Sequence, residues 1–181
     1  DVYKRQPGPY GIGGFGWNAY DFVDFLASCK QHYWQILPLT TTSYGDSPYQ
    51  SFSARAGNPN FIDFAELIEA GYLEQRDIDG VYLGSDPSNV DYGAIFGGRR
   101  QILDRAAERF AADKPADFDD FIQANEDWLI PYCEFMTVKE ECGLKAFWEW
   151  PAELRTRGEA SAKVCADHPA RMLYHQMTQY F

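Results

Sequence analysis

The chain has 181 residues, and its 27 acidic residues outnumber its 16 lysines and arginines, which gives a formal net charge of −11 at pH 7. An acidic chain without a basic patch repels nucleic-acid phosphates and anionic lipids, so we expect neither nucleic acid nor a membrane as a partner. Hydrophobic residues make up 45% of the chain, enough to build the core of an ordinary domain. Because the sequence has no long apolar span and no secretory-signal pattern, we expect a soluble, cytoplasmic protein.

We expect a first helix over residues 18–30, with Asn18 as its cap. Its apolar stripe, expected to face inward, consists of Tyr20, Val23, Leu26 and Ala27. Residues 33–38 form a short apolar run that ends in a proline, which predicts a buried strand. Gly, Pro, Ser, Asn and Asp then dominate residues 39–60, which predicts a long loop. Loops of this length in a compact domain are usually functional or disordered.

After this loop the pattern becomes helical. Asp63 and Glu66 resemble a capping box at the start of a short helix, and Gly71 is placed to end it. A longer helix is expected over residues 92–112. These features place the second half of the chain in a mainly helical region.

The clearest periodic pattern covers residues 117–142, where apolar side chains keep the spacing of one helix face. That face consists of Phe118, Phe121, Ile122, Trp128, Leu129, Tyr132, Phe135 and Met136. Pro131 should kink or split this helix, and a last helix should begin near Pro169 and run to Phe181. One strand among helices cannot satisfy its own backbone groups, so the elements together predict an incomplete fold.

Neither the cysteines nor the histidines indicate a metal or redox site. None of the 4 cysteines forms a C-x-x-C pair, so we expect buried, reduced thiols. His168 and His175 could share a helix face, but neither an H-E-x-x-H motif nor a carboxylate at ligand spacing accompanies them. We therefore expect neither a metal nor another cofactor.

Two segments match parts of known motifs but lack the neighbouring residues that those motifs require. Residues 11–16 read G-I-G-G-F-G, but no strand precedes them, and Ile36 stands where a dinucleotide site needs an acid. We interpret them as a glycine-rich turn. Ser47 lies in a tight turn, but a nucleophile elbow needs a glycine at the position of Tyr49.

The acidic pairs show no catalytic arrangement. Such pairs occur at residues 119–120 and 140–141, and Asp77 is close to Asp79. Glycoside chemistry needs two carboxyl groups that face each other across a bond, whereas neighbours on a helix point in different directions. We therefore expect all of these carboxylates on the solvated surface.

The 39–60 loop alternates aromatic rings with small polar groups. Tyr44, Tyr49 and Phe52 interleave with Asp46, Ser47, Gln50, Ser51 and Ser53. Flat apolar faces beside hydrogen-bonding groups suit a sugar ring. The residues leave a second interpretation open, namely an ordinary loop whose aromatic rings pack into the core.

Three neighbouring segments carry a family resemblance. Residues 34–39 read W-Q-I-L-P-L, residues 44–54 read Y-G-D-S-P-Y-Q-S-F-S-A, and residues 56–59 read A-G-N-P. With these segments the chain resembles the 4-alpha-glucanotransferases of the amylomaltase or disproportionating-enzyme type. The similarity extends over nearly all of residues 7–181.

The resemblance implies an α/β fold, namely the N-terminal portion of a (β/α)8 TIM barrel with a largely helical insertion subdomain. Residues 1–6 would then be a non-native leader. Residues 7–62 would form the early barrel with a loop on its active-site face, and residues 63–181 the insertion subdomain, with the remainder of the barrel absent. The implied reaction is a retaining transfer of an α-1,4-glucan segment. Its partners would be α-1,4-glucans and maltooligosaccharides, with glucose as an acceptor.

The resemblance also assigns roles to single residues. Tyr49 would stack on a sugar near the cleavage point, and Asp46 and Ser47 would line the same groove. Tyr44 would belong to a secondary glucan site, whose aromatic partner matches Phe96, a phenylalanine where the family has a tyrosine.

The family's catalytic carboxylates match no residue of this chain. In the family they belong to later barrel strands, so we expect them beyond Phe181. We therefore expect no catalytic residue here, and no catalysis by these 181 residues alone.

Two other functions remain open. The chain could be a glucan-binding or protein-interaction module without catalysis, and loss of maltoheptaose binding in Tyr44→Ala would favour the glucan-binding form. It could instead belong to a hydrolase of a related barrel type. Hydrolysis adds a reducing end with every bond that is cut, whereas transfer keeps their number constant.

Overall fold

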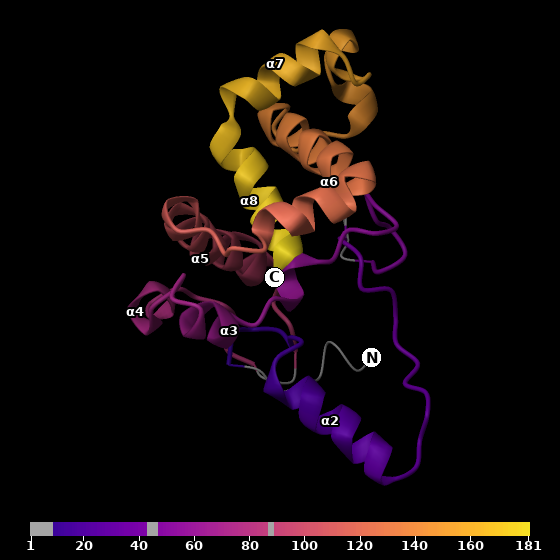
Figure 1. The fold of residues 1–181 in the computed structure, drawn as a ribbon, viewed down its shortest axis with the longest axis vertical. Helices are drawn as coiled ribbons and strands as arrows, with labels where there is room; N and C mark the ends of the chain where they lie inside the picture. Colours follow the sequence, from indigo (N-terminus) through magenta and orange to yellow (C-terminus); the bar gives the residue numbers. More distant parts are fainter. Residues whose placement is uncertain (1–8, 43–46, 87–88) are drawn as a thin grey trace. The chain divides into compact units, whose positions relative to one another are not determined.

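The computed structural model describes residues 9–42, 47–86 and 89–181 (Figure 1). These residues form helices joined by loops. None of them belongs to a β-strand, and one isolated antiparallel bridge joins Thr40 to Gly57. The chain divides into two compact units, residues 1–106 and residues 107–181. No helix in the described ranges is long and apolar enough to span a membrane.

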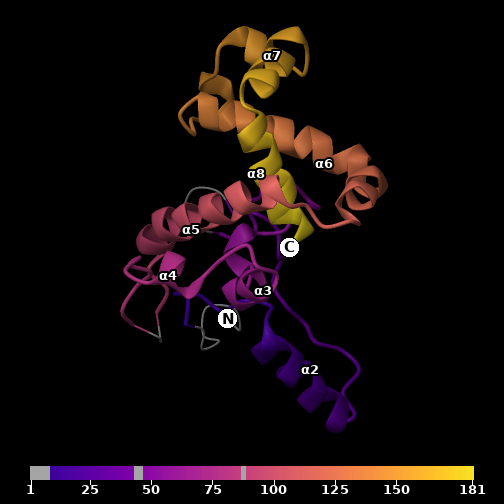
Figure 2. The ribbon, with the colours of Figure 1, turned by 60° about the vertical axis from the view of Figure 1, so that its left-hand side comes forward.

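Unit 1 contains three complete helices, a short 3-10 helix and the first part of a long helix. They are α2 (Trp17–Ser28), η1 (Pro59–Phe61), α3 (Phe64–Glu69), α4 (Gln75–Ile78) and α5 (Tyr92–Ala112). In both ribbon views α2 projects away from α3 and α4, and the chain returns from its far end as an extended loop (Figures 1 and 2). The predicted long helix over residues 92–112 is thus confirmed as α5.

Helix α3 begins and ends as its sequence predicts. The Asp63 side chain caps it, because Oδ1 accepts a hydrogen bond from the Ala65 N–H at 2.9 Å. Gly71 follows its last turn with φ of +84°, a conformation in which a residue with a Cβ would be strained. The largest fully buried apolar side chains of this unit come from α3, α5 and the turn after α3, and include Phe64, Leu67, Leu73, Ile95, Ile102 and Leu103.

Helix α2 confirms the predicted helix but not its predicted packing. Its N-cap is Gly16, not Asn18, and no side chain caps it. The expected inward stripe is wrong, because Tyr20 and Val23 are exposed and Ala19 is the buried residue of the helix. An apolar stripe becomes buried only where another element packs on it, and none of the described segments covers this face of α2.

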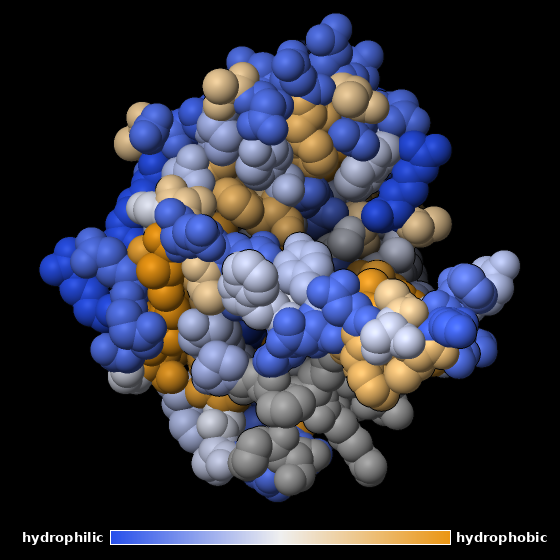
Figure 3. All heavy atoms as spheres, turned by 60° about the horizontal axis from the view of Figure 1, so that its bottom comes forward, coloured by the Kyte–Doolittle hydropathy of each residue, from blue (hydrophilic) through white to orange (hydrophobic). Residues whose placement is uncertain are grey.

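The strand expected over residues 33–38 does not form. These residues belong to no ladder, and 94% of the Tyr33 side chain is exposed. A strand needs a hydrogen-bonded neighbour, and none of the described residues lies alongside as one. Figure 3 shows one face of the molecule, on which apolar residues reach the surface between hydrophilic ones.

Unit 2 is helical and starts with the end of α5. Its further elements are α6 (Phe118–Glu141), η2 (Phe147–Glu149), η3 (Ala152–Leu154), α7 (Glu159–Asp167) and α8 (Pro169–Tyr180). Helices α6 and α8 confirm the two predicted helices of this region. Helix α6 runs through Pro131 without a break, so the proline does not split it.

The predicted aromatic face of α6 lies in the core of unit 2. All of its members are buried or half-buried, with Leu129 fully buried. Phe118 packs edge-on against Phe110 of α5, with ring centroids 4.8 Å apart. Phe121 packs against Tyr180 of α8 at 5.3 Å. Edge-to-face pairs of this kind add about 0.5–1.5 kcal/mol beyond the area that they bury.

The same aromatic cluster includes Phe181, the residue that caps the C-terminal end of α8. Its N–H donates to the Met177 carbonyl at 3.1 Å. Its half-buried ring lies 6.0 Å from Phe110 and 5.1 Å from Tyr180, measured between centroids. Helix α8 thus ends at Tyr180, one residue earlier than predicted, and Phe181 contributes to the packing of unit 2.

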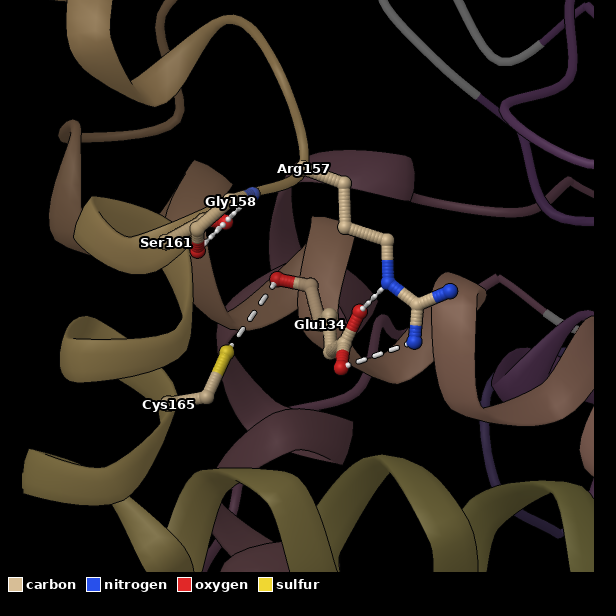
Figure 4. Close-up of polar contacts among 5 residues, drawn as sticks. All are labelled: Glu134, Arg157, Gly158, Ser161 and Cys165. Atoms are coloured by element: carbon tan, nitrogen blue, oxygen red, sulfur yellow. Dashed lines mark hydrogen bonds and ion pairs between the residues drawn. The ribbon is translucent and has the colours of Figure 1, made fainter.

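Polar contacts connect the middle of α6 to α7 and the turn before it (Figure 4). Both oxygens of the Glu134 carboxylate accept hydrogen bonds from the guanidinium of Arg157. The Cys165 thiol donates to the Glu134 carbonyl oxygen at 3.9 Å. At the start of α7 the Gly158 N–H donates to Ser161 Oγ at 2.9 Å. These contacts fix the direction in which α7 begins.

Two of the acidic residues expected on the surface are buried or nearly so. Glu140 has a side chain that is only 12% exposed, and it forms ion pairs with Arg171 and His175 of α8. Asp77 is buried, and its carboxylate accepts the Glu74 N–H at 2.8 Å in the capping box of α4. The expectation was wrong for Glu140 because its partners come from α8, which residue spacing does not reveal, and for Asp77 because its carboxylate caps its own short helix.

The cysteines are free, in line with the expectation of reduced thiols. Cys133 is buried, and burial raises the pKa of its thiol to about 12. Cys29, in contrast, is exposed at the end of α2, so the expectation of burial fails for it.

Candidate functional site

The ends of the 39–60 loop are joined by backbone hydrogen bonds. The Asn58 N–H donates to the Leu39 carbonyl at 2.9 Å, and the Thr41 N–H donates to the Ala56 carbonyl at 3.2 Å. These bonds flank the bridge between Thr40 and Gly57. The long segment is therefore closed at its base, as in a compact surface loop that presents side chains from a fixed frame.

Serine side chains shape the second half of this loop. Ser53 Oγ accepts hydrogen bonds from the N–H groups of Arg55 at 3.1 Å and of Ala56 at 3.0 Å. Ser51 Oγ lies 3.1 Å from Thr41 Oγ1 and donates to the Ser53 carbonyl at 2.6 Å. Hydroxyl groups that bond to nearby backbone hold turns in one conformation. The serine side chains of the loop thus stabilise its backbone conformation.

Ser47 and Tyr49 lie in a turn at the tip of the described part of this loop. Ser47 Oγ accepts the Tyr49 N–H at 3.4 Å, and the Gln50 N–H donates to the Ser47 carbonyl at 3.1 Å. The Tyr49 side chain is 74% exposed. The structure therefore brings these two candidates together and leaves the tyrosine ring available for stacking.

The other candidates are not brought into this cluster. Phe96 is exposed in the first turns of α5. In the described part of the chain, neither the Phe96 ring nor the Tyr49 ring has an aromatic neighbour. Tyr44 and Asp46 lie outside the described residues, so the proposed pair of Tyr44 with Phe96 stays a prediction.

Arg99 supports the base of the loop and was not singled out from the sequence. Its guanidinium is buried, donates to the carbonyl oxygens of Tyr10 and Ile62, and lies over the Phe64 ring at 4.0 Å. Burial, and then the nearby Asp63 carboxylate, raise the pKa of Tyr10. A signal was present in the sequence, because Arg99 stands on the apolar face of α5, four residues after Ile95.

The groups around Ser47 and Tyr49 are of the kinds that can bind a ligand without reacting with it. An exposed ring beside hydroxyl and amide groups can hold a sugar. No group of three or more His, Cys, Asp or Glu residues that could hold a metal ion occurs among the residues that the structure describes. The carboxyl of Glu140 in unit 2 has a pKa lowered to about 2, but an ion pair between helices explains it.

Phe181 is half-buried, and its ring packs on Phe110 and Tyr180 in unit 2. The position of the catalytic carboxylates beyond Phe181 stays a prediction.

Sequence comparison identifies the family of the chain. A family model described as 4-alpha-glucanotransferase matches residues 5–181. The chain belongs to the 4-alpha-glucanotransferase family. It is 51% identical over 178 residues to a 4-alpha-glucanotransferase of Streptococcus pneumoniae serotype 4, a match that covers 97% of this chain and 35% of that protein. It is 43% identical to one of Clostridium butyricum, covering 83% of this chain and 31% of the relative.

A solved structure from the family has the same fold. The amylomaltase from Streptococcus agalactiae in complex with acarbose matches with a TM-score of 0.90 and 44% identity, over 98% of this chain and 37% of that one. The chain thus spans about a third of the length of the relatives that it matches. The family resemblance inferred from residues 34–59 is confirmed.

Proposed function

We propose that these residues are part of a 4-alpha-glucanotransferase, which moves a segment of an α-1,4-glucan from a donor to the 4-position of an acceptor glucose or glucan. The family match over residues 5–181 carries this proposal. The acarbose named with the solved relative supports a glucan as the ligand class. A carboxylate would attack the anomeric carbon of the donor while an acid protonates the leaving oxygen. The hydroxyl of the acceptor sugar would then attack the same carbon, break its bond to the carboxylate and return a proton to the acid residue.

Within that reaction we propose that this chain binds the sugar units of the substrate. Tyr49 would stack on a sugar near the cleavage point, with Ser47 and Asp46 in the same groove. The exposure of the Tyr49 ring and the closed base of its loop support this assignment. Tyr44 and Phe96 would form a secondary glucan site. The two catalytic carboxylates and the stabilising aspartate would come from parts of the protein outside these 181 residues.

We also propose that the chain forms the N-terminal part of a (β/α)8 barrel, in which residues 33–38 become a strand once a neighbouring strand lies beside them. Their apolar sequence and the uncovered stripe of α2 support this placement. Residues 63–181 would then be the insertion subdomain and residues 7–62 the early barrel. The free cysteines fit the reducing cytoplasm, where we place the protein.

The test is a Tyr49→Ala substitution in the longest natural polypeptide that contains this chain. Loss of the stacking ring should lower kcat/KM for transfer between maltooligosaccharides about tenfold or more, since tenfold corresponds to about 1.4 kcal/mol of binding in the transition state. Tyr49→Phe should retain most of the activity, because it keeps the ring. Tyr82→Ala removes another exposed tyrosine of unit 1 and serves as the matched control. Unchanged kinetics in Tyr49→Ala would refute the assignment.

A further inference from the structure

Residues 142–150, here called the Trp148 loop, join α6 to the segment before α7 and present large apolar side chains to solvent. The Trp148 side chain is 73% exposed, and Phe147 and Leu144 are also exposed. No described aromatic residue packs against Trp148. Large apolar groups gathered in one exposed loop often mark a binding surface.

A buried lysine holds the beginning of the Trp148 loop. Lys139 of α6 is 8% exposed, and its Nζ donates to the carbonyl oxygens of Leu144 at 3.1 Å and Lys145 at 2.8 Å. Burial lowers the pKa of Lys139. A lysine is seldom buried without partners, because desolvation of its charge is costly. Here the partners are backbone groups of the loop itself.

The buried side chain of Trp150 fixes the C-terminal end of the Trp148 loop. Trp150 is 2% exposed, and its Nε1–H donates to the Lys145 carbonyl at 3.1 Å. Its ring lies 5.2 Å from Phe135 of α6 and 5.5 Å from Phe147, measured between ring centroids. Arg155 donates from Nε to the Trp150 carbonyl at 2.8 Å. The two ends of the loop are thus fixed to the α6 side of unit 2.

The backbone of the loop is tightly constrained between these ends. Leu144 has φ of +59°, in the left-handed region that residues with a Cβ rarely adopt. Glu149 Oε2 accepts the Ala146 N–H at 3.1 Å, which closes η2 around the exposed residue Trp148. Strained, over-determined backbone is concentrated at ligand sites. The fold therefore constrains the backbone at Trp148 and leaves the ring exposed.

The size of the surface argues for a small ligand. A stable protein interface buries about 800 Å² on each partner, whereas a large aromatic side chain buries about 150–250 Å². Three partly exposed side chains fall well below the first figure. A flat ring on a loop that also carries the exposed Lys145 and Glu149 matches a glucose unit, which offers C–H groups on its faces and hydroxyls at its rim.

We propose that the Trp148 loop is an additional glucan-binding surface, on which the indole of Trp148 stacks against a glucose ring of a bound α-1,4-glucan chain. The inference takes its ligand class from the proposed function. Its residues are separate from Tyr44, Tyr49 and Phe96. Such a surface would raise the affinity for long chains, because each contact after the first is intramolecular.

The experiment observes Trp148 directly, in the longest natural polypeptide that contains this chain. The protein is labelled with 5-fluorotryptophan, and the fluorine resonance of Trp148 is assigned as the one that disappears in Trp148→Phe. Maltoheptaose should shift this resonance saturably at millimolar concentrations, and sorbitol, which has no ring face, should not. The shift should persist in Tyr49→Ala, because the two surfaces share no residue.

The outcomes separate this proposal from the transferase assignment. A Trp148 resonance that maltoheptaose leaves unmoved overturns the surface, whether or not the protein transfers glucans. A resonance that moves when the protein itself is diluted, but not with sugar, also overturns it and indicates a contact with a second copy. A saturable shift in a protein without transfer activity supports the surface and contradicts the proposed function alone.

Discussion

Arg99 shows how a single buried cation can organise a loop. Its guanidinium joins the backbone of Tyr10 to that of Ile62 and lies over the Phe64 ring, so one side chain connects three segments of unit 1. Arginine can form these contacts better than lysine, because its planar guanidinium donates hydrogen bonds in several fixed directions at once. The loop that carries Ser47 and Tyr49 ends directly before this anchor.

Arg99→Met should therefore destabilise the fold by about 3 kcal/mol or more, since two charge-assisted hydrogen bonds contribute about 1.5–3 kcal/mol each. Arg99→Lys keeps the charge but not the geometry and should recover only part of the loss. Urea unfolding of the three proteins measures the effect. Equal stability of Arg99→Met and the parent would show that the guanidinium is not an anchor.

Glu140 links stability to pH in unit 2. Burial alone would raise the pKa of this carboxyl, but His175, whose Nε2 lies 3.1 Å from Oε1, and Arg171, which donates two hydrogen bonds, lower it to about 2. Because the folded pKa lies below the unfolded value, the ionised form stabilises the fold. This contribution, up to about 3 kcal/mol, is complete above about pH 4.5 and is lost as the pH falls towards 2.

The corresponding test compares Glu140→Gln with the parent chain at several pH values. The variant should be less stable at pH 6, and the difference between the two free energies of unfolding should shrink steadily between about pH 4.5 and 2. Glu141→Gln, next to it on α6 but exposed, is the matched control. A difference that stays constant down to the acid end would contradict the ion-pair account.

At the scale of elements, periodicity predicted the helices whose apolar face is covered within the chain. The α5 and α6 regions and the start of α8 at Pro169 were predicted to within one or two residues, because their apolar stripes are buried within the described units. The packing of α2 and the structure of residues 33–38 were predicted wrongly, because each prediction requires a neighbouring element that no described segment supplies. Short helices such as α4 and α7 depend on local capping. They contain too few turns for a repeating apolar pattern to be recognised in the sequence.

For the candidate site too, features that are local in sequence were predicted, and contacts between segments were not. The alternation of rings and small polar groups around Tyr49 predicted a recognition loop, since the signal is local in sequence. The supports from Arg99 and Lys139 were missed, because each bonds to backbone carbonyls of another segment. Their position on an apolar helix face was the available signal, but it does not tell which carbonyls they reach.

Ser53 gives a test at the scale of the loop. Ser53→Ala removes the acceptor for the N–H groups of Arg55 and Ala56, so their hydrogen exchange should become about tenfold faster or more. Amide exchange followed by NMR measures this directly. Ser85→Ala, an exposed serine in another loop, should leave these amides unchanged. Unaltered protection in Ser53→Ala would mean that other contacts hold the turn.

At the scale of the whole molecule, the chain corresponds to about a third of the relatives that it matches, and the apolar stripe of α2 is uncovered within the described residues. We therefore expect the 181 residues alone to show no transfer activity on maltotriose. Chromatography of the sugars after long incubation tests this expectation. Formation of glucose together with longer maltooligosaccharides by these residues alone would mean that they contain a catalytic pair that the account has not found.

The central claim is tested most directly by the products of the longest natural polypeptide that contains this chain. Incubation with maltotriose should give glucose and a series of longer maltooligosaccharides, while the number of reducing ends stays constant, because every bond that breaks is replaced by a new one. Both quantities come from one reaction, by chromatography and a reducing-end assay. A rise in reducing ends with each cleavage would show a hydrolase, and unchanged maltotriose would leave the chain without the activity of its family.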